Sequence, residues 1–241
     1  MVDEHRQWLE AMEAKSRAKQ QQFMDGIAAK LKRPRLASKP EQPFRGAPDY
    51  WRGFEWSEEE RIERFSHNFT SVGGHVARVS DMNEAKAFIA GKAEEMGAKY
   101  IVRQQEAELE ALGLEEALPD AVMSVWNSDP EEHWKARAAE ADFGIVMADH
   151  AVAYTGSVTV LSSKDKGRSV SLLPTVLMIV LPSDRIKTRL GEVLIELDRA
   201  GRANLPAGVH FISGPSRSSD IENDLTIGVH GPGIVYAIIV G

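Results

Sequence analysis

The stretch Leu177-Met178-Ile179-Val180-Leu181 contains no polar side chain. Successive side chains of a strand point to opposite faces of a sheet, so a strand needs apolar residues at every position only when both faces are covered. Residues 236–240 (Tyr-Ala-Ile-Ile-Val) have the same character. These two stretches predict central strands of a sheet that is buried between two layers.

Outward from these strands, runs of strand and helix character alternate along the chain. Further strands are predicted at 74–79, 99–102, 121–126, 142–148, 156–162 and 208–213. Helices are predicted at 57–72, where Ser57 and Glu60 have the spacing of a capping box, and at 83–96, 105–111, 129–141 and 184–200. The alternation predicts an α/β fold built on a mostly parallel sheet. The strands at 156–162 and 176–181 follow one another without a predicted helix, so we also expect a hairpin and an antiparallel insertion.

The first part of the chain has a different character. Residues 4–31 show loose amphipathic spacing and contain no proline, which predicts a helix. Residues 34–50 contain four prolines, and aromatic side chains gather from Phe44 to Trp56, so we expect an arm that packs on the body or on another subunit. The sequence therefore predicts an N-terminal helical arm at 1–56 and an α/β domain at 57–241.

The amino-acid composition excludes several classes of functional site. The 241 residues include 29 Lys and Arg, 36 Asp and Glu, a net charge of −7, and no cysteine, which excludes disulfides, thiolate nucleophiles and cysteine-ligated clusters in this chain. No apolar run approaches the roughly 18 residues of a membrane span, and the charged start of the chain lacks the apolar core of a signal peptide. We therefore expect a cytoplasmic protein. A basic cluster lies within residues 30–35, but no nucleic-acid-binding signature accompanies it, so we expect no nucleic-acid partner.

The richest candidate site is the loop at 212–222, which follows a predicted strand. Ser219 and Glu222 have the spacing of a capping box, which predicts a helix that starts in this loop. A helix start at the carboxyl edge of a parallel sheet would offer backbone N–H groups to an anion, and Arg217 would add a positive charge. The candidate ligand-binding residues in this loop are Ser213, Gly214, Ser216, Arg217, Ser218 and Asp220.

Three further turns carry candidate residues. Arg168 follows a glycine and precedes two serines, and it can bind a carboxylate or phosphate or tie loops together through backbone carbonyls. Thr155 and Gly156 lie in a turn that enters a strand, and His230 lies in a glycine-rich turn where it can contact a ligand or be structural. No metal-ligand spacing is present, so no metal is predicted. Catalytic residues are left unassigned.

At these loops the sequence resembles the lactate utilization protein C family, which is defined by the LUD domain. The resemblance rests on residues 141–145, 155–157, 167–174, 212–222 and 228–232, and on residues 27–35 near the start of the chain. It implies a three-layer α/β/α fold similar to those of ribose-phosphate isomerase and the CoA transferases. It also implies a role in the oxidation of L-lactate to pyruvate, with two iron–sulfur partner proteins that carry the clusters.

The chain departs from the family pattern at two positions. Tyr154 stands where the family usually has glutamate, and Leu177 stands where it usually has histidine. A tyrosine is a poor base near neutral pH, so the departures favour binding over catalysis.

The sequence therefore predicts a non-redox subunit that binds a small anionic ligand. Two alternatives remain open: a stand-alone transferase or isomerase acting on a phosphorylated or CoA-linked molecule, and an assembly scaffold. The step that the subunit performs and its homo-oligomeric state are also left open.

Overall fold

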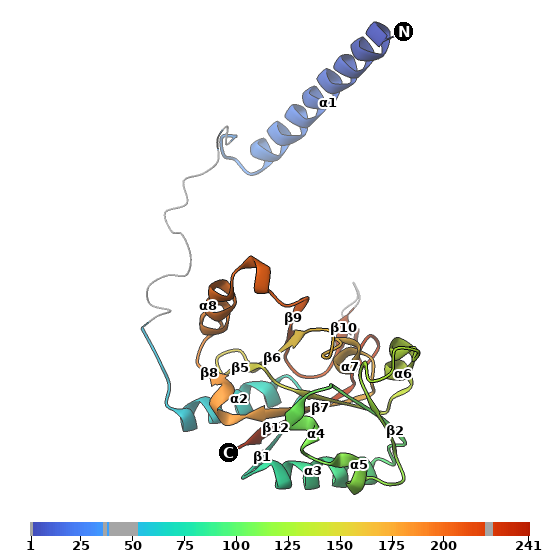
Figure 1. Cartoon of the computed structure of the whole chain (residues 1–241). Helices are drawn as coiled ribbons and strands as arrows, with labels where there is room; N and C mark the ends of the chain where they lie inside the picture. Colours follow the sequence, from blue (N-terminus) through green and yellow to red (C-terminus); the bar gives the residue numbers. More distant parts are fainter. Residues whose placement is uncertain (1, 36–37, 39–52, 220–223) are drawn as a thin grey trace. The chain divides into compact units, whose positions relative to one another are not determined.

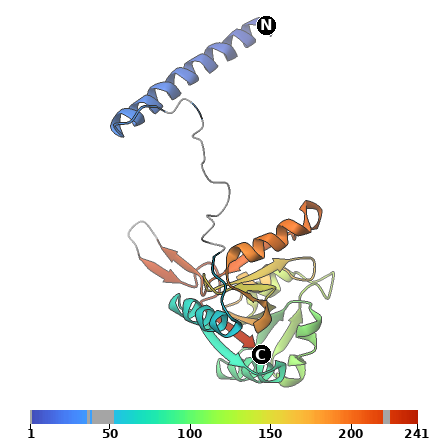
Figure 2. The ribbon, with the colours of Figure 1, turned by 90° about the vertical axis from the view of Figure 1, so that its left-hand side faces the viewer.

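The computed structural model describes residues 2–35, 38, 53–219 and 224–241. The chain divides into two compact units, Met1–Phe54 and Glu55–Gly241 (Figures 1 and 2). In the first unit the predicted helix is confirmed as α1 (Val2–Lys30). Its large apolar side chains lie on the surface, and Phe23 is 69% exposed. Among the described residues of this unit, 2–35, 38 and 53–54, none buries a continuous apolar face of the helix.

The second unit is built on a six-stranded sheet whose order is β1-β12-β7-β4-β2-β3, and every neighbouring pair in it is parallel. Its strands are β1 (His75–Val79), β2 (Tyr100–Arg103), β3 (Val122–Val125), β4 (Phe143–Met147), β7 (Val176–Pro182) and β12 (Ile234–Val240). The predicted α/β class with a mostly parallel sheet is therefore confirmed, and β7 and β12 are central strands as expected.

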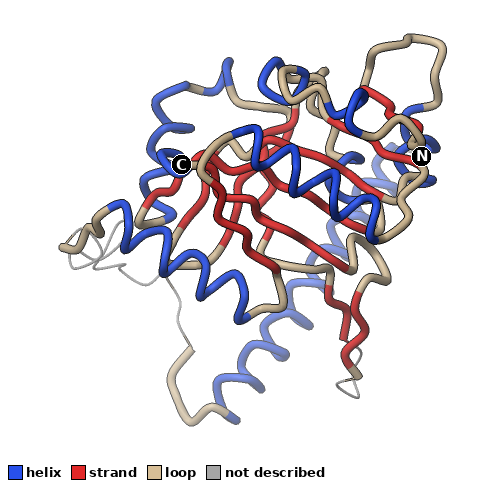
Figure 3. Tube along the Cα trace, turned by 90° about the horizontal axis from the view of Figure 1, so that it is seen from below, coloured by secondary structure: helices blue, strands red, loops and turns tan. Residues whose placement is uncertain are grey.

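Helices cover one face of this sheet, as Figure 3 shows. They are α3 (Met82–Glu95), α4 (Ala107–Glu110) and α5 (Leu114–Ala117). Asp81 fixes the start of α3, because its carboxylate accepts hydrogen bonds from the N–H groups of Asn83 and Glu84. Ile89 and Leu109 pack in this layer against alternate residues of the strands, among them Met178 of β7.

The other face is covered by α2 (Glu58–Ser71) and by a second sheet of order β8-β5-β6-β9. The strands of the second sheet are β5 (His150–Val152), β6 (Ser157–Ser162), β8 (Ile186–Lys187) and β9 (Gly208–Ile212). Ile179 of β7 packs with Phe65 of α2 and Val158 of β6 in this second core. Burial of both side-chain sets of β7 explains why the strand is apolar throughout.

The remaining elements are short or lie outside the two main layers. They are α6 (Trp134–Glu140), α7 (Ser169–Leu172), the 3-10 turns η2 (Ser183–Arg185) and η3 (Arg202–Asn204), α8 (Leu190–Ala200), and a hairpin of β10 (Arg217–Ser219) and β11 (Leu225–Ile227). Figure 2 shows this hairpin projecting from the body of the unit.

The antiparallel insertion is present, but its pairing differs from the expected hairpin. β6 pairs antiparallel with β5 and with β9, whereas β7 belongs to the other sheet. The connection between β6 and β7 holds α7, whose four residues are too few to give a helical period in the sequence.

Two predicted helices are shorter than expected. The helix predicted at 184–200 begins only at Leu190, because Ile186 and Lys187 pair with β5 as a strand. The helix predicted at 129–141 begins at Trp134. Asp129 does not cap it; its carboxylate instead accepts a hydrogen bond from the N–H of Glu131 in the preceding turn.

The connections of β2 and β4 leave the sheet on opposite faces. β2 leads to α4 and α5 in the helical layer, and the adjacent strand β4 leads to β5 and β6 in the second sheet. In open α/β sheets, ligands bind at the carboxyl ends of adjacent strands whose connections diverge in this way. The carboxyl ends of β2 and β4 are therefore the switch point of this fold.

A substitution at Gly144 of β4 tests whether α7 packs closely against the parallel sheet. A Cβ atom at Gly144 would lie 2.1 Å from the carbonyl oxygen of Val170, so backbone must move to admit it. We expect Gly144→Ala to lower the free energy of unfolding by about 1–3 kcal/mol, measured by urea denaturation. Gly91→Ala in α3 is the matched control, since a Cβ there meets nothing within 4 Å, and it should leave stability unchanged or raise it. Equal stability of both variants would contradict this packing.

Candidate functional site

The loops at 155–157, 212–219 and 228–232, which carry much of the resemblance, gather at the amino edge of the parallel sheet and not at its carboxyl edge. β9 runs antiparallel to β6 in the second sheet, so the loop after β9 returns to the start of β1 and β12. There Arg217 donates a hydrogen bond to the carbonyl oxygen of Val72, at the end of α2. The expectation that this loop follows a strand of the parallel sheet is therefore wrong, because the local pattern of β9 does not reveal its pairing partner.

Most of the polar groups in these loops hold the loops to one another. The N–H of Ser216 donates to the carbonyl of Pro232 at 2.9 Å, and the carbonyl of Ser216 accepts from the N–H of Gly228 at 2.9 Å. The hydroxyls of Ser213 and Ser157 are 2.7 Å apart. Arg217 and Ser216 thus have structural partners, in addition to any ligand contact that the sequence predicts for them.

Two glycines of the predicted site have a steric reason to be glycine. Gly156 has φ of +59°, and a Cβ on it would lie 2.6 Å from the backbone nitrogen of Phe69 in α2. Gly214 has φ of +80° and lies against Val72. Thr155 and His230 are exposed. The structure thus brings Thr155, Gly156, Ser213, Gly214, Ser216 and Arg217 together at one edge of the sheet.

The segment from Arg217 to Ser219 is a strand of the hairpin, with Ser218 opposite Thr226. The helix predicted from the spacing of Ser219 and Glu222 does not start at this point, because Ser219 pairs with Leu225 in the β ladder. Asp220 and Glu222 lie outside the described residues. The positive end of a helix is therefore not available at Ser219 to attract an anion.

Arg168 precedes α7, in the connection between β6 and β7, and its charge acts on His210 of β9. Gly167 allows the loop to pack directly on Trp126, because a Cβ atom at this position would lie 2.0 Å from the indole ring. The Nε2 atom of His210 lies 2.7 Å from the hydroxyl of Ser162. Burial lowers the pKa of His210 below its ordinary value, and the positive charge of Arg168 lowers it further. Among the described contacts, none joins the guanidinium of Arg168 to an acidic side chain.

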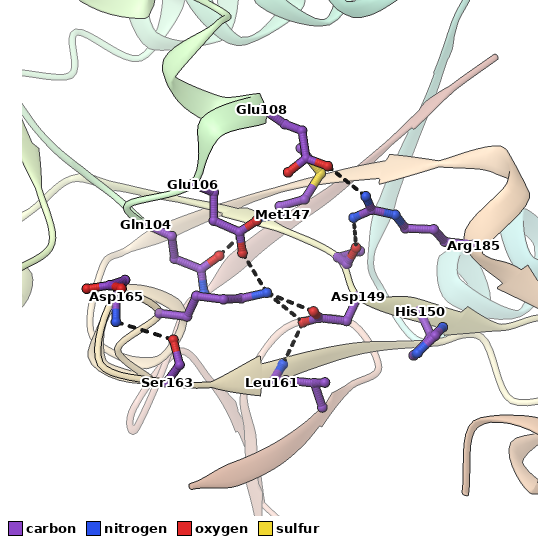
Figure 4. A network of polar contacts seen from close by, with 12 residues as sticks. Gln104, Glu106, Glu108, Met147, Asp149, His150, Leu161, Ser163, Asp165 and Arg185 are labelled. Atoms are coloured by element: carbon purple, nitrogen blue, oxygen red, sulfur yellow. Dashed lines mark hydrogen bonds and ion pairs between the residues drawn. The ribbon is translucent and has the colours of Figure 1, made fainter. Parts of the chain in front are cut away.

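A second polar constellation occupies the switch point at the carboxyl ends of β2 and β4 (Figure 4). The Nζ atom of Lys166 lies 2.5 Å from Glu106 and 2.8 Å from Asp149. The carboxylate of Asp149 also accepts a hydrogen bond from the N–H of Leu161 at 2.7 Å. The side chains of Lys166 and Glu106 are each 15% exposed. Charges held this far from water interact strongly, since they are screened less than surface pairs.

Arg185, just after β7, extends this constellation. Its guanidinium donates to the carbonyl of Ala148 at 2.7 Å and lies 2.8 Å from Glu108. The hydrogen bond from Arg185 lowers the pKa of Glu108, so this carboxyl is ionised at neutral pH. The two residues that follow β4 are thus each bound by a cation: Ala148 by Arg185 and Asp149 by Lys166. Each cation also pairs with a glutamate of the α4 segment, Arg185 with Glu108 and Lys166 with Glu106.

Reasoning from the sequence missed this constellation. Its members are separated by up to 79 positions, from Glu106 to Arg185, and they match no spacing motif. A signal was nevertheless present, because polar residues follow two of the predicted strands directly: Gln104 to Glu106 after the first and Asp149 after the second. Carboxyl ends of adjacent parallel strands meet at one edge, but adjacency of these strands is decided by the tertiary fold.

Within the described part of the chain, no group of three or more His, Asp or Glu side chains is arranged to hold a metal ion. The same residues include no helix that is both long and apolar enough to cross a membrane.

The parallel sheet, the mixed second sheet and the loops between them define an α/β domain with polar side chains gathered at both edges of the parallel sheet. The LUD domain family matches residues 62–240, so the chain belongs to this family. A Lactate utilization protein C from Halalkalibacterium halodurans is 32% identical, over 87% of this chain and 92% of the relative. One from Shouchella clausii is 30% identical, again over 87% and 92%.

A crystal structure of a DUF162 family protein from Deinococcus radiodurans has a similar fold. Its TM-score with this chain is 0.57 at 21% identity, and the match covers 77% of this chain and 99% of that protein. At this identity the likeness supports the fold alone.

The two departures from the family pattern lie in different surroundings. Tyr154 is 46% exposed, and its ring stacks on that of Trp56 with centroids 6.2 Å apart. Leu177 is 1% exposed and packs in the core between the two sheets. A polar side chain at 177 would be buried there, so the leucine also contributes to packing.

The surroundings of His210 predict an acid-sensitive fold. Because its pKa is lowered in the folded state, the unfolded chain binds the proton more tightly, and stability falls as pH decreases below about 6.5. We expect His210→Gln to weaken this dependence in urea unfolding experiments between pH 7 and pH 5. His150, whose pKa burial also lowers, accounts for part of what remains. The exposed control His67→Gln should leave the dependence unchanged; an equal effect of both variants would contradict the assignment.

Proposed function

We propose that this chain takes part in L-lactate utilization as a subunit without its own redox centre. The observation that carries the proposal is the similarity to relatives named Lactate utilization protein C, which extends over about nine-tenths of their length. The homologues support a role in lactate utilization. The likeness of the fold to ribose-phosphate isomerase and the CoA transferases remains a prediction.

The proposed subunit works with two iron–sulfur partner proteins in the cytoplasm. The chain contains no cysteine, so any cluster with cysteine ligands in such a system is bound by another protein. Electrons from lactate would then pass through the partners. The role of this chain would be to bind a small anionic ligand.

Arg168 is the proposed contact for a small anionic ligand. Its side chain is exposed and positively charged, and Gly167 fixes its loop against Trp126. Burial, and then the positive charge of Arg168, lower the pKa of His210, so its imidazole adds no second positive charge near pH 7. An arginine fork suits a carboxylate, which L-lactate carries. Ser213, Gly214, Ser216, Arg217, Ser218, Asp220, His230, Thr155 and Gly156 stay predicted as ligand-binding residues.

L-Lactate is the probe for this site. We expect Arg168→Ala to weaken L-lactate binding at least about tenfold in calorimetric titration, since a hydrogen bond to a charged group contributes about 1.5–3 kcal/mol. The same variant should fail to restore growth on L-lactate to a Bacillus subtilis strain that lacks its Lactate utilization protein C. Arg199→Ala, an exposed arginine on α8, is the control and should behave as the unaltered chain does. Full binding by Arg168→Ala would exclude Arg168 as the anion contact.

A scaffold role is the second candidate function, and the exposed apolar side chains of α1 favour it. Trp8 is 57% exposed and Phe23 69% exposed within a helix of 29 residues. An isolated helix is marginal in water, so burial of these side chains against a partner would stabilise it. Basic residues follow in the stretch 30–35, where they would suit an acidic partner surface.

Removal of residues 1–54, the first unit, separates the scaffold role from ligand binding and leaves Trp56 in place. We expect the truncated chain to bind L-lactate as the full chain does and to lose co-purification with the two iron–sulfur proteins. Circular dichroism and thermal unfolding of the truncated chain serve as the control for folding. Undiminished co-purification would assign the partner surface to the α/β domain instead.

A further inference from the structure

Ser162 and His210 form a polar pair at the end of β6. The Oγ atom of Ser162 lies 2.7 Å from Nε2 of His210. In the antiparallel ladder of β6 and β9, Ser162 is opposite Gly208, and His210 is opposite Val160. Residues two positions apart on a strand share a face, so both side chains lie on the same face as Val160, which packs in the core between the two sheets. The pair therefore lies at the border of this core.

The surroundings of the pair leave one ring nitrogen of His210 available. A Cβ atom at Gly208 would lie 2.9 Å from Nε2 of His210 and 3.5 Å from Oγ of Ser162, so the glycine leaves room for their hydrogen bond. Ser162 is buried, whereas the imidazole is half-buried. None of the described residues forms a hydrogen bond with Nδ1 of His210, and solvent contacts this atom. The pair thus presents Nδ1 of a fixed imidazole to a ligand.

Arg168 follows the same end of β6. The N–H of Ser163 donates to the carbonyl of Lys166 at 3.2 Å, which closes a turn and returns the chain to the end of the strand two residues before Arg168. Arg168 then begins α7, whose Val170 packs in the core between the two sheets. The lowered pKa of His210 agrees with this placement, because a cation lowers the pKa of an imidazole only at short range.

A hydroxyl group is the ligand group that suits this imidazole. A neutral imidazole carries one N–H donor and one acceptor nitrogen, and the hydroxyl of Ser162 can either donate to Nε2 or accept from it. Nδ1 is therefore a donor in one tautomer and an acceptor in the other. A ligand hydroxyl can also donate and accept, so it matches both. An ammonium group only donates, and it would be repelled by the charge of Arg168.

We propose that His210, held in place by Ser162, recognises the 2-hydroxyl group of a 2-hydroxycarboxylate whose carboxylate binds to Arg168. L-Lactate has this pattern, because its hydroxyl is on the carbon next to its carboxylate. The inference rests on the proposed function, since it takes Arg168 as the anion contact. It extends that function by naming the substrate class and the residue that selects it. Ser162 is a positioning residue, because its buried hydroxyl acts through the imidazole.

Propionate, which has no hydroxyl group but is otherwise L-lactate, is the comparison ligand for the full-length chain. We expect the unaltered chain to bind L-lactate about three- to tenfold more tightly than propionate, which is the range that one neutral hydrogen bond contributes. His210→Phe keeps a planar ring and removes both nitrogens. It should lower the affinity for L-lactate to that for propionate and leave the affinity for propionate unchanged, which also shows that the Arg168 site is intact.

Variants of Ser162 test its positioning role. Ser162→Ala should reduce the preference for L-lactate, because the imidazole is no longer fixed through Nε2. Ser162→Thr keeps a hydroxyl and suits a strand, so it should restore the preference. The exposed control His67→Phe should leave it unchanged. Calorimetric titration at constant pH and ionic strength measures the affinities, and circular dichroism checks the fold.

Equal affinity of the unaltered chain for the two acids would overturn this proposal, and so would a full preference for L-lactate in folded His210→Phe. If both acids bind equally and Arg168→Ala weakens both, the proposed anion contact stands and only the recognition of the hydroxyl fails. If Arg168→Ala weakens neither acid, or if neither acid binds to the unaltered chain, the anion contact and this proposal fail together.

Discussion

Burial of β7 on both faces is the constraint on which the second unit depends. A strand with parallel neighbours on both sides exposes two apolar sets of side chains, and each set needs its own layer. Met178 packs under the helices, and Ile179 packs under α2 and the second sheet. One layer consists of helices, and the other contains α2 and a second sheet. The connection after β2 enters the first layer and the connection after β4 enters the second, so the switch point lies at the carboxyl ends of these two strands.

The second sheet decides where each polar loop is found. Its strand β6 leads from the amino edge to the carboxyl edge of the parallel sheet, and β9 leads in the opposite direction. The serine-rich loop after β9 therefore reaches the end of α2, where Arg217 binds the carbonyl of Val72. The loop after β6 instead carries Lys166 to the carboxyl ends of β2 and β4. One antiparallel pair thus separates the serine-rich loop after β9 from the charged switch point.

The two edges differ in their chemistry. At the amino edge, backbone groups and serine hydroxyls satisfy one another, and glycines at 156 and 214 permit close approach of the chain. At the carboxyl edge, charged side chains satisfy one another across the ends of strands. Arg168 belongs to neither arrangement; it lies in the connection between β6 and β7, and its charge lowers the pKa of His210.

The sequence by itself determined the buried central strands, the start of α2 at Ser57, helix α1, and the absence of any cysteine ligand. These features depend on periodicity, capping and composition, which are local. Only the tertiary structure decided the partners of β6 and β9, the conversion of Ser219 from a predicted helix cap to a strand residue, and the meeting of Lys166 with Glu106 and Asp149. Strand pairing and ion pairs between distant positions depend on which segments become neighbours, and no local pattern of residues encodes that adjacency.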